Sequence, residues 1–121
     1  MTVQVLEPEL DRLESLWADG LADSYRAYQD GVPNVQPKLA LAAALVETGI
    51  RLQGLGGRAA PPTVLLMGDL CLARGSRLLA DHATLDVQVA FAEAIQLLSS
   101  AAAAEQTAPS ARHLLQKALS R

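Results

Sequence analysis

Aromatic residues and clusters of positive charge are scarce in this chain. One Trp, two Tyr and one Phe offer no platform on which nucleic-acid bases could stack. Lys and Arg never form a run, and the formal net charge is −3, so a polyanionic ligand is not favoured either. We therefore expect a protein that does not bind nucleic acid.

Cysteine and long apolar runs are also nearly absent. The single cysteine, Cys71, excludes an internal disulfide and fits a reducing compartment. The acidic start of the chain lacks the basic and apolar regions of a signal peptide, and the longest apolar runs are too short to span a bilayer. We expect a cytoplasmic protein without a transmembrane segment.

Alanine and leucine supply most of what is present. Hydrophobic residues make up 50 % of the 121 residues, and these two are the strongest helix formers among them. No segment shows the clean alternation of a half-buried strand. The sequence therefore predicts an all-α fold, a bundle of about five helices in a single domain over residues 1–121.

The spacing of the apolar residues predicts where these helices lie. We expect helices over about residues 8–28, 37–55 and 62–80, a fourth from 84 to about 106, and a short last helix after Pro109. We predict two loops, one over residues 30–34 and one over the glycine- and proline-rich residues 54–62. Thr84 has a side chain suited to capping the fourth helix.

The helix expected over residues 62–80 is unusual because it is apolar almost all round. Between Val64 and Ala73 only Gly68 and Asp69 interrupt the apolar residues. A helix that is apolar on all sides is expected to be buried on all sides. Either its neighbours within the chain cover it, or a second chain does, and Gly68 would allow close packing in both cases. One apolar face runs through Leu66, Leu70 and Ala73, and the other runs through Leu65, Leu72 and Leu79.

Residues suited to catalysis or metal binding do not form a recognisable pattern. His82 and His113 have no Cys or His at ligand spacing, so a metal site is not expected. Cys71 lies within the apolar helix and reads as a small buried hydrophobe. Asp19 and Asp23 are one helical turn apart and read as a solvated face. We predict no catalytic, metal or cofactor residues in this chain.

One long segment does resemble a known family. Residues 64–81, VLLMGDLCLARGSRLLAD, are similar to a helix of the trans-isoprenyl diphosphate synthases that contains a Gly-Asp pair. Residues 87–106 resemble the helix that follows in that family. Residues 41–55 resemble the helix that leads into its first aspartate-rich motif. The resemblance covers roughly residues 39–106.

The family's metal-binding motifs are missing from this sequence. The upstream helix of the family ends in aspartates that hold Mg²⁺ against the allylic diphosphate, whereas this chain has Gly56, Gly57 and Arg58 there. No Asp-Asp pair occurs, and the second aspartate-rich motif would lie beyond residue 121. The resemblance therefore implies a non-catalytic small subunit of a heterodimeric hexaprenyl or heptaprenyl diphosphate synthase. Its large catalytic partner would carry the Mg²⁺. The partner would need the small subunit for activity and for control of the product's chain length. The product of the heterodimer would become the side chain of menaquinone.

The family's Gly-Asp helix and the next helix form its dimer interface. The resemblance thus implies a partner interface made of residues from both helices, namely Leu66, Gly68, Asp69, Leu70, Ala73, Phe91 and Ile95. Without the large subunit, the chain is expected to self-associate through the same helices. Two alternatives remain open: a stand-alone module that homodimerises through this face, and a degenerate enzyme that still binds an isoprenoid chain.

Overall fold

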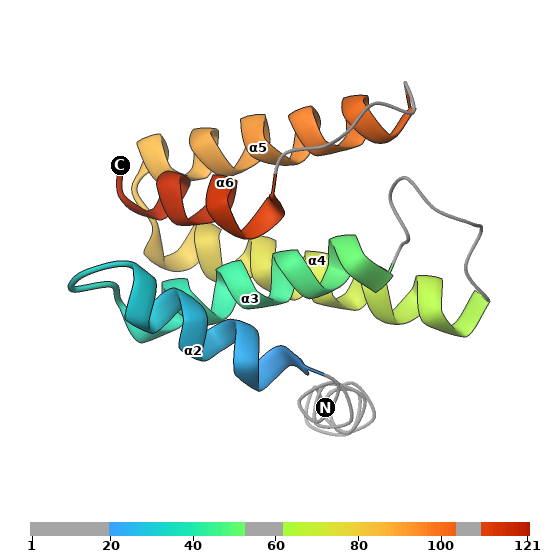
Figure 1. Ribbon diagram of the computed structural model, residues 1–121, viewed down its shortest axis with the longest axis horizontal. Helices are drawn as coiled ribbons and strands as arrows, with labels where there is room; N and C mark the ends of the chain where they lie inside the picture. Colours follow the sequence, from blue (N-terminus) through green and yellow to red (C-terminus); the bar gives the residue numbers. More distant parts are fainter. Residues whose placement is uncertain (1–19, 53–61, 104–109) are drawn as a thin grey trace.

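The chain folds into a bundle of helices (Figure 1). The computed structural model describes residues 20–52, 62–103 and 110–121. These ranges contain five helices and no strand: α2 (Ala22–Gly31), α3 (Pro37–Leu52), α4 (Pro62–His82), α5 (Leu85–Ala103) and α6 (Ala111–Leu119). The predicted all-α architecture is confirmed. The predicted start of the first helix near Pro8 and most of the predicted loop at 54–62 lie outside the described residues.

Local side-chain chemistry explains several of the helix boundaries. The turn between α2 and α3 holds Asn34 in the left-handed conformation, with a φ of 59°, which Asn tolerates better than most residues. The predicted cap at Thr84 is confirmed, because its hydroxyl oxygen accepts the backbone N–H of Val87 at 3.3 Å. Ser110 caps α6 in the same way by accepting the N–H of His113 at 3.3 Å.

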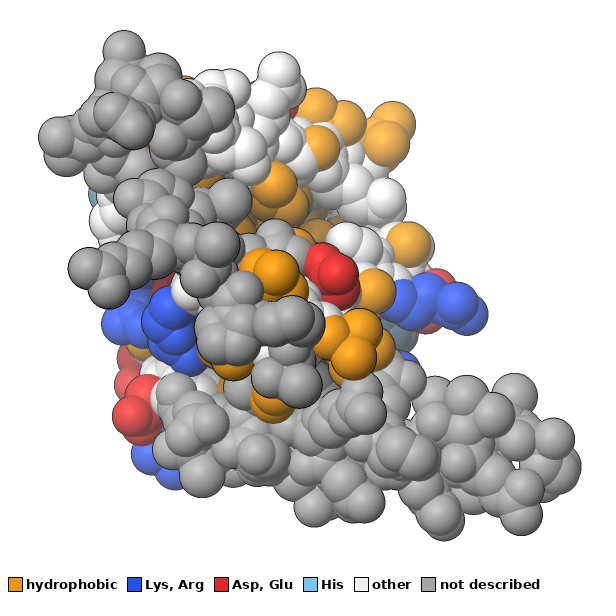
Figure 2. Space-filling model, turned by 90° about the vertical axis from the view of Figure 1, so that its right-hand side faces the viewer, with side chains coloured by type: hydrophobic (Ala, Val, Ile, Leu, Met, Phe, Trp, Pro, Cys, Tyr) orange, Lys and Arg blue, Asp and Glu red, His pale blue; other side chains and the backbone are white. Residues whose placement is uncertain are grey.

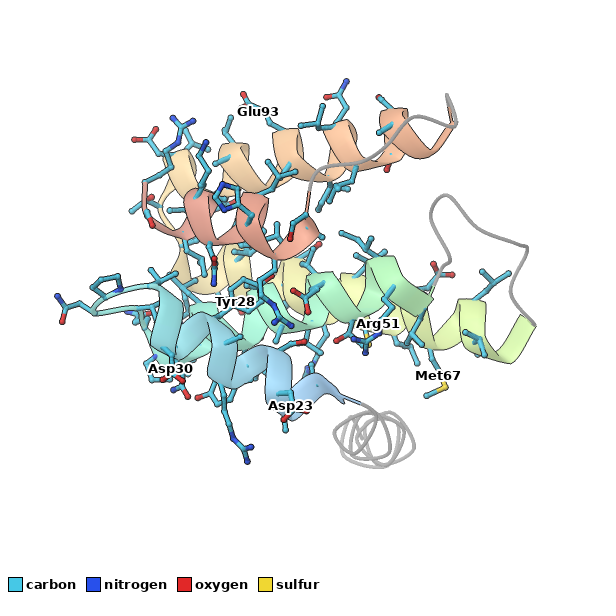
Figure 3. All side chains as sticks on the ribbon, in the orientation of Figure 1. Asp23, Tyr28, Asp30, Arg51, Met67 and Glu93 are labelled. Atoms are coloured by element: carbon cyan, nitrogen blue, oxygen red, sulfur yellow. The ribbon has the colours of Figure 1, made fainter. Side chains whose placement is uncertain are left out.

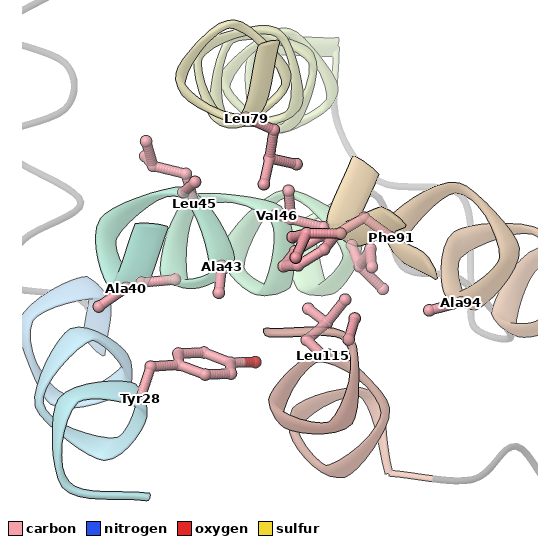
Figure 4. Packing of buried hydrophobic residues seen from close by; sticks show 14 of the residues in the cluster. Tyr28, Ala40, Ala43, Leu45, Val46, Leu79, Phe91, Ala94 and Leu115 are labelled. Atoms are coloured by element: carbon pink, nitrogen blue, oxygen red, sulfur yellow. The ribbon is translucent and has the colours of Figure 1, made fainter. Parts of the chain in front are cut away.

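The centre of the bundle is α3, not α4. It packs against α2, α4 and α6, and all residues from 42 to 50 are buried (Figure 4). The alanines of α3 let three neighbouring helices approach it closely. In contrast, α4 leaves one side open to solvent, so of the two possibilities considered for this helix, complete cover by its neighbours within the chain is not observed.

Glycines bring α3 and α4 unusually close. A Cβ atom placed on Gly75 would lie 2.9 Å from Val46 Cγ2 and 3.0 Å from the carbonyl oxygen of Ala42. A Cβ on Gly49 would lie 2.9 Å from the carbonyl oxygen of Gly68, which is itself buried. Real Cβ atoms do not make such short contacts, so these crossing positions require glycine. Gly68 therefore lies where α3 and α4 pack together within the chain.

The largest buried side chains come from different helices. Tyr28 of α2, Val46 of α3, Phe91 of α5 and Leu115 of α6 are almost inaccessible to solvent (Figure 4). Burying a large apolar side chain contributes about 1.5–3 kcal/mol, so these residues tie four helices into one core. None of the helices in the described ranges has the length and apolar character needed to cross a lipid bilayer.

Candidate functional site

Large hydrophobic side chains are exposed on only two of the described helices. Leu65 and Leu66 project from α4, and Leu85, Val89 and Leu97 project from α5. The exposed fraction reaches 48 % for Leu66 and 73 % for Leu85. In the view of Figure 2 several hydrophobic side chains reach the surface, with an acidic side chain among them. Single exposed hydrophobics are common, so it is their restriction to α4 and α5 within the described residues that makes these two helices candidates for binding a partner.

The outer face of α4 contains four of the seven residues predicted to contact a partner. Leu66, Asp69 and Ala73 are exposed and Leu70 is half-buried. Their spacing of three and four residues places them on one side of the helix. The opposite face of α4 is mostly covered; it was predicted to run through Leu65, Leu72 and Leu79. Leu79 is buried and Leu72 lies against Gly49 of α3. Leu65 remains exposed.

The other three predicted residues lie deeper. Gly68 is buried at the crossing with α3, and Phe91 belongs to the core. Ile95 is half-buried and packs against the same core. In the isolated chain Gly68 and Phe91 are thus covered by other parts of the bundle, and Ile95 is only partly exposed.

On α5 the exposed residues form a stripe that the sequence reasoning missed. Leu85, Val89, Glu93 and Leu97 are all exposed and follow one another at intervals of four residues. We call these four residues the α5 stripe. The buried residues Val87, Phe91 and Leu98 have similar spacing, so helical periodicity indicates two apolar faces without saying which one points inward.

A buried polar cluster joins three helices around Glu47 of α3. Ser24 of α2 donates a hydrogen bond to the Glu47 carboxylate at 2.6 Å, and the Tyr28 hydroxyl donates another at 2.9 Å. Arg112 of α6 donates two more, through Nε and Nη2, each at 3.1 Å. Figure 4 shows the Tyr28 ring extending from α2 towards α6. All the hydrogen-bonding capacity of the carboxylate is thus used within the chain.

The surroundings of Glu47 keep it ionised. Burial alone would raise its pKa, but the hydrogen bonds from Arg112, Ser24 and Tyr28 together outweigh burial and bring the pKa below its ordinary value. Burial and the adjacent Glu47 charge raise the pKa of Tyr28, so the Tyr28 hydroxyl remains a protonated donor. The cluster holds α2, α3 and α6 together and is not poised for acid–base catalysis at neutral pH.

Sequence reasoning did not single out Glu47, although a signal was present. Glu47 is the only charged residue between Leu39 and Ile50, in the middle of an alanine-rich helix. A lone carboxylate at such a position needs a partner once the helix is buried. The identity of that partner could not be read from the sequence, because Arg112 is 65 residues away.

The described residues offer little for catalysis or metal binding. No group of three or more His, Cys, Asp and Glu side chains comes together in the described ranges. Cys71 is fully buried, and burial raises its pKa to about 11, so it is a neutral thiol at physiological pH. Asp19 and the segment from Gly56 to Arg58 lie outside the described residues.

Comparisons of the chain with protein-family models, curated proteins and solved structures found no match. The features of this chain that bear on function are therefore the exposed side chains of α4 and α5 and the resemblance carried by residues 39–106. The polar cluster around Glu47 stabilises the fold.

Proposed function

We propose that this chain is the non-catalytic small subunit of a heterodimeric trans-polyprenyl diphosphate synthase, and that α4 and α5 bind the large catalytic subunit. One observation carries the proposal. All the large exposed hydrophobics among the described residues lie on α4 and α5. These are also the two helices whose sequences resemble the dimer-forming helices of the synthase family.

The outer face of α4 has the composition of a helix-packing surface. Ala73 is small enough to allow close approach of another helix, and Leu66 offers an apolar side chain on the same side. Obligate interfaces usually bury more than about 2,000 Å² in total, with a largely apolar centre. Helices of 21 and 19 residues, each about 30 Å long, are long enough to contribute to such an interface.

In this proposal the large subunit performs the chemistry. It carries both aspartate-rich motifs and the Mg²⁺ that neutralises the diphosphate leaving group. The small subunit packs against it, is required for its activity and takes part in setting the length of a C30 to C35 product. The heterodimer would act in the cytoplasm and supply the side chain of menaquinone.

Co-expression with a synthase subunit that has two aspartate-rich motifs, taken from the same genome, tests the proposal. We expect the two chains to co-purify, and only the complex to elongate an allylic diphosphate with isopentenyl diphosphate and Mg²⁺. Leu66→Asp should abolish co-purification without loss of helicity, because Leu66 is half exposed in the isolated chain. Gln36→Asp, which adds a charge at an exposed site before α3, is the matched control and should bind normally.

Three results would overturn the proposal. Prenyl elongation by this chain alone would show that it is not a non-catalytic subunit. If the chain does not bind the synthase but sedimentation shows a homodimer that Leu66→Asp abolishes, the chain is a homodimerising module instead. A monodisperse species of 12.8 kDa that binds neither the synthase nor a hydrophobic dye would contradict both functions.

A further inference from the structure

The chain enters the described part of the fold at a glycine that breaks the helical path. Gly20 has a φ of 112°, a conformation that residues with a side chain rarely adopt and that a regular helix does not contain. The helix α2 begins at Ala22, after this glycine, whereas the sequence predicts one helix over residues 8–28. A helix over residues 8–19 therefore cannot continue straight along the axis of α2.

Gly20 is close to the first half of α4. A Cβ atom on Gly20 would lie 3.5 Å from Nη2 of Arg51, which is in the last turn of α3. The glycine contacts described above pair late residues of α3 with early residues of α4, so the two helices are antiparallel. Arg51 is therefore level with the turn of α4 that contains Leu66 and Met67. Figure 3 shows Arg51 and Met67 at the same end of the bundle as the start of α2.

An apolar strip of α4 is open to solvent at this level. Leu66 is 48 % exposed, and Met67 and Leu70 are half-buried on the same side of the helix. We call these three residues the α4 strip. Helical spacing places the half-buried Arg74 at the Met67 edge of the strip and the exposed Asp69 at the opposite edge. An acidic segment that covers the strip is therefore attracted to its Met67 edge, the edge with the positive charge.

The sequence of residues 8–19, PELDRLESLWAD, has the composition that this strip requires. Leu10, Leu13 and Trp17 follow one another at three and four residues and form one apolar side. The segment also carries four acidic side chains and one basic side chain. As a helix, its 12 residues extend over about 18 Å, whereas Leu66 and Arg74 are about 12 Å apart along α4. The segment is thus long enough to cover the α4 strip and to reach Arg74.

We infer that residues 8–19 form an amphipathic helix that packs Leu13 and Trp17 on the α4 strip of the same chain, with acidic side chains towards Arg74. The segment is joined to the fold at Gly20, close to the strip, so this contact avoids the entropic cost of binding a second molecule. The docked segment covers Leu66 and so shields the surface proposed for the large subunit in the free chain. That consequence, unlike the docking itself, rests on the proposed function.

Tryptophan fluorescence of the full chain tests the inference, because Trp17 is its only tryptophan. We expect emission at shorter wavelengths than that of free tryptophan amide, and weaker quenching by acrylamide, at every protein concentration. Leu66→Asp should shift the emission to longer wavelengths and increase quenching, because it places a carboxylate beneath the indole ring. Leu97→Asp is the matched control: Leu97 of the α5 stripe is 49 % exposed, and its replacement should change neither signal.

A second pair of variants tests the contact from the side of the segment. Leu13→Asp should expose Trp17 as Leu66→Asp does, because Leu13 lies one helical turn before Trp17 on the apolar side. Ser15→Asp adds the same charge on the opposite side of the predicted helix and should leave the fluorescence unchanged. Circular dichroism checks that every variant is folded.

Three outcomes would overturn the inference. A Trp17 as accessible to acrylamide as free tryptophan amide would show that the segment is not docked. Shielding that persists in Leu66→Asp would place the segment on another surface. Shielding that appears only as the protein concentration rises, together with a dimer in sedimentation, would show that the α4 strip binds a second copy. These measurements use the free chain without the synthase, so the docking and the proposed function can each fail while the other holds.

Discussion

Replacing Glu47 by Gln is expected to lower the free energy of unfolding by about 2–3 kcal/mol, although the side chain keeps its size. The substitution replaces an acceptor oxygen by an NH₂ group that faces the donors of Arg112, and it leaves Ser24 or Tyr28 without its acceptor. Removing one partner of a fully buried ion pair lowers the stability by more than this. The loss is smaller here because the Arg112 side chain is 45 % exposed and can turn towards water. Urea denaturation at neutral pH measures the change.

A matched control comes from an exposed ion pair on α4. Arg77 donates a hydrogen bond to Asp81 at 3.2 Å, one turn along the helix, and both side chains are largely exposed. Asp81→Asn should therefore cost no more than about 0.5 kcal/mol. If Glu47→Gln costs no more than this control, the cluster does not hold the three helices together.

The contribution of Glu47 should also depend on pH. Its pKa in the folded protein lies below the ordinary value of 4.5, so the ionised carboxylate stabilises the folded state at all pH values above that ordinary value. This stability is lost as the pH falls through the folded-state pKa. Urea denaturation at a series of pH values should show the wild type and Glu47→Gln converging below about pH 4.5. A difference that stays constant or grows on acidification would contradict the ionised cluster.

The second large effect is expected at the crossing of α3 and α4. Replacing Gly49 by Ala should destabilise the protein by about 1–2 kcal/mol. Helix propensity alone predicts the opposite effect, because alanine usually stabilises a helix interior by up to about 1 kcal/mol relative to glycine. The reason is the added Cβ, which would lie 2.7 Å from Leu72 Cγ and 2.9 Å from the Gly68 carbonyl oxygen. The backbone of α4 cannot yield as a flexible side chain would.

Two measurements check this prediction. Urea denaturation gives the stability, and modification of Cys71 by a thiol reagent gives the opening of α4, because this thiol is buried in the native protein. Gly49→Ala should speed the modification. Gly31→Ala is the control: the three atoms nearest to its added Cβ all belong to the flexible side chain of Gln116, so both readouts should change little. If Gly49→Ala stabilises the protein, the two helices are not in close contact there.

Local features of the sequence were sufficient to predict most of the secondary structure. Alanine and leucine favour helix, and their spacing of three and four residues marks amphipathic segments. Pro37 at the first position of α3 and the Thr84 cap before α5 act through their immediate neighbours. Such interactions span only a few residues, so they can be recognised before any tertiary contact is known.

Patterns in the sequence were enough to identify an all-α protein and the approximate limits of α3, α4, α5 and α6. The tertiary structure decided which helix lies at the centre, which helix Gly68 approaches and which partner neutralises Glu47. It also decided which apolar face of α5 points outward. Both faces of α5 are apolar, so periodicity cannot distinguish them, and Glu47 and Arg112 meet across 65 residues. Burial depends on how distant segments pack together, and a pattern read within one helix contains no information about its neighbours.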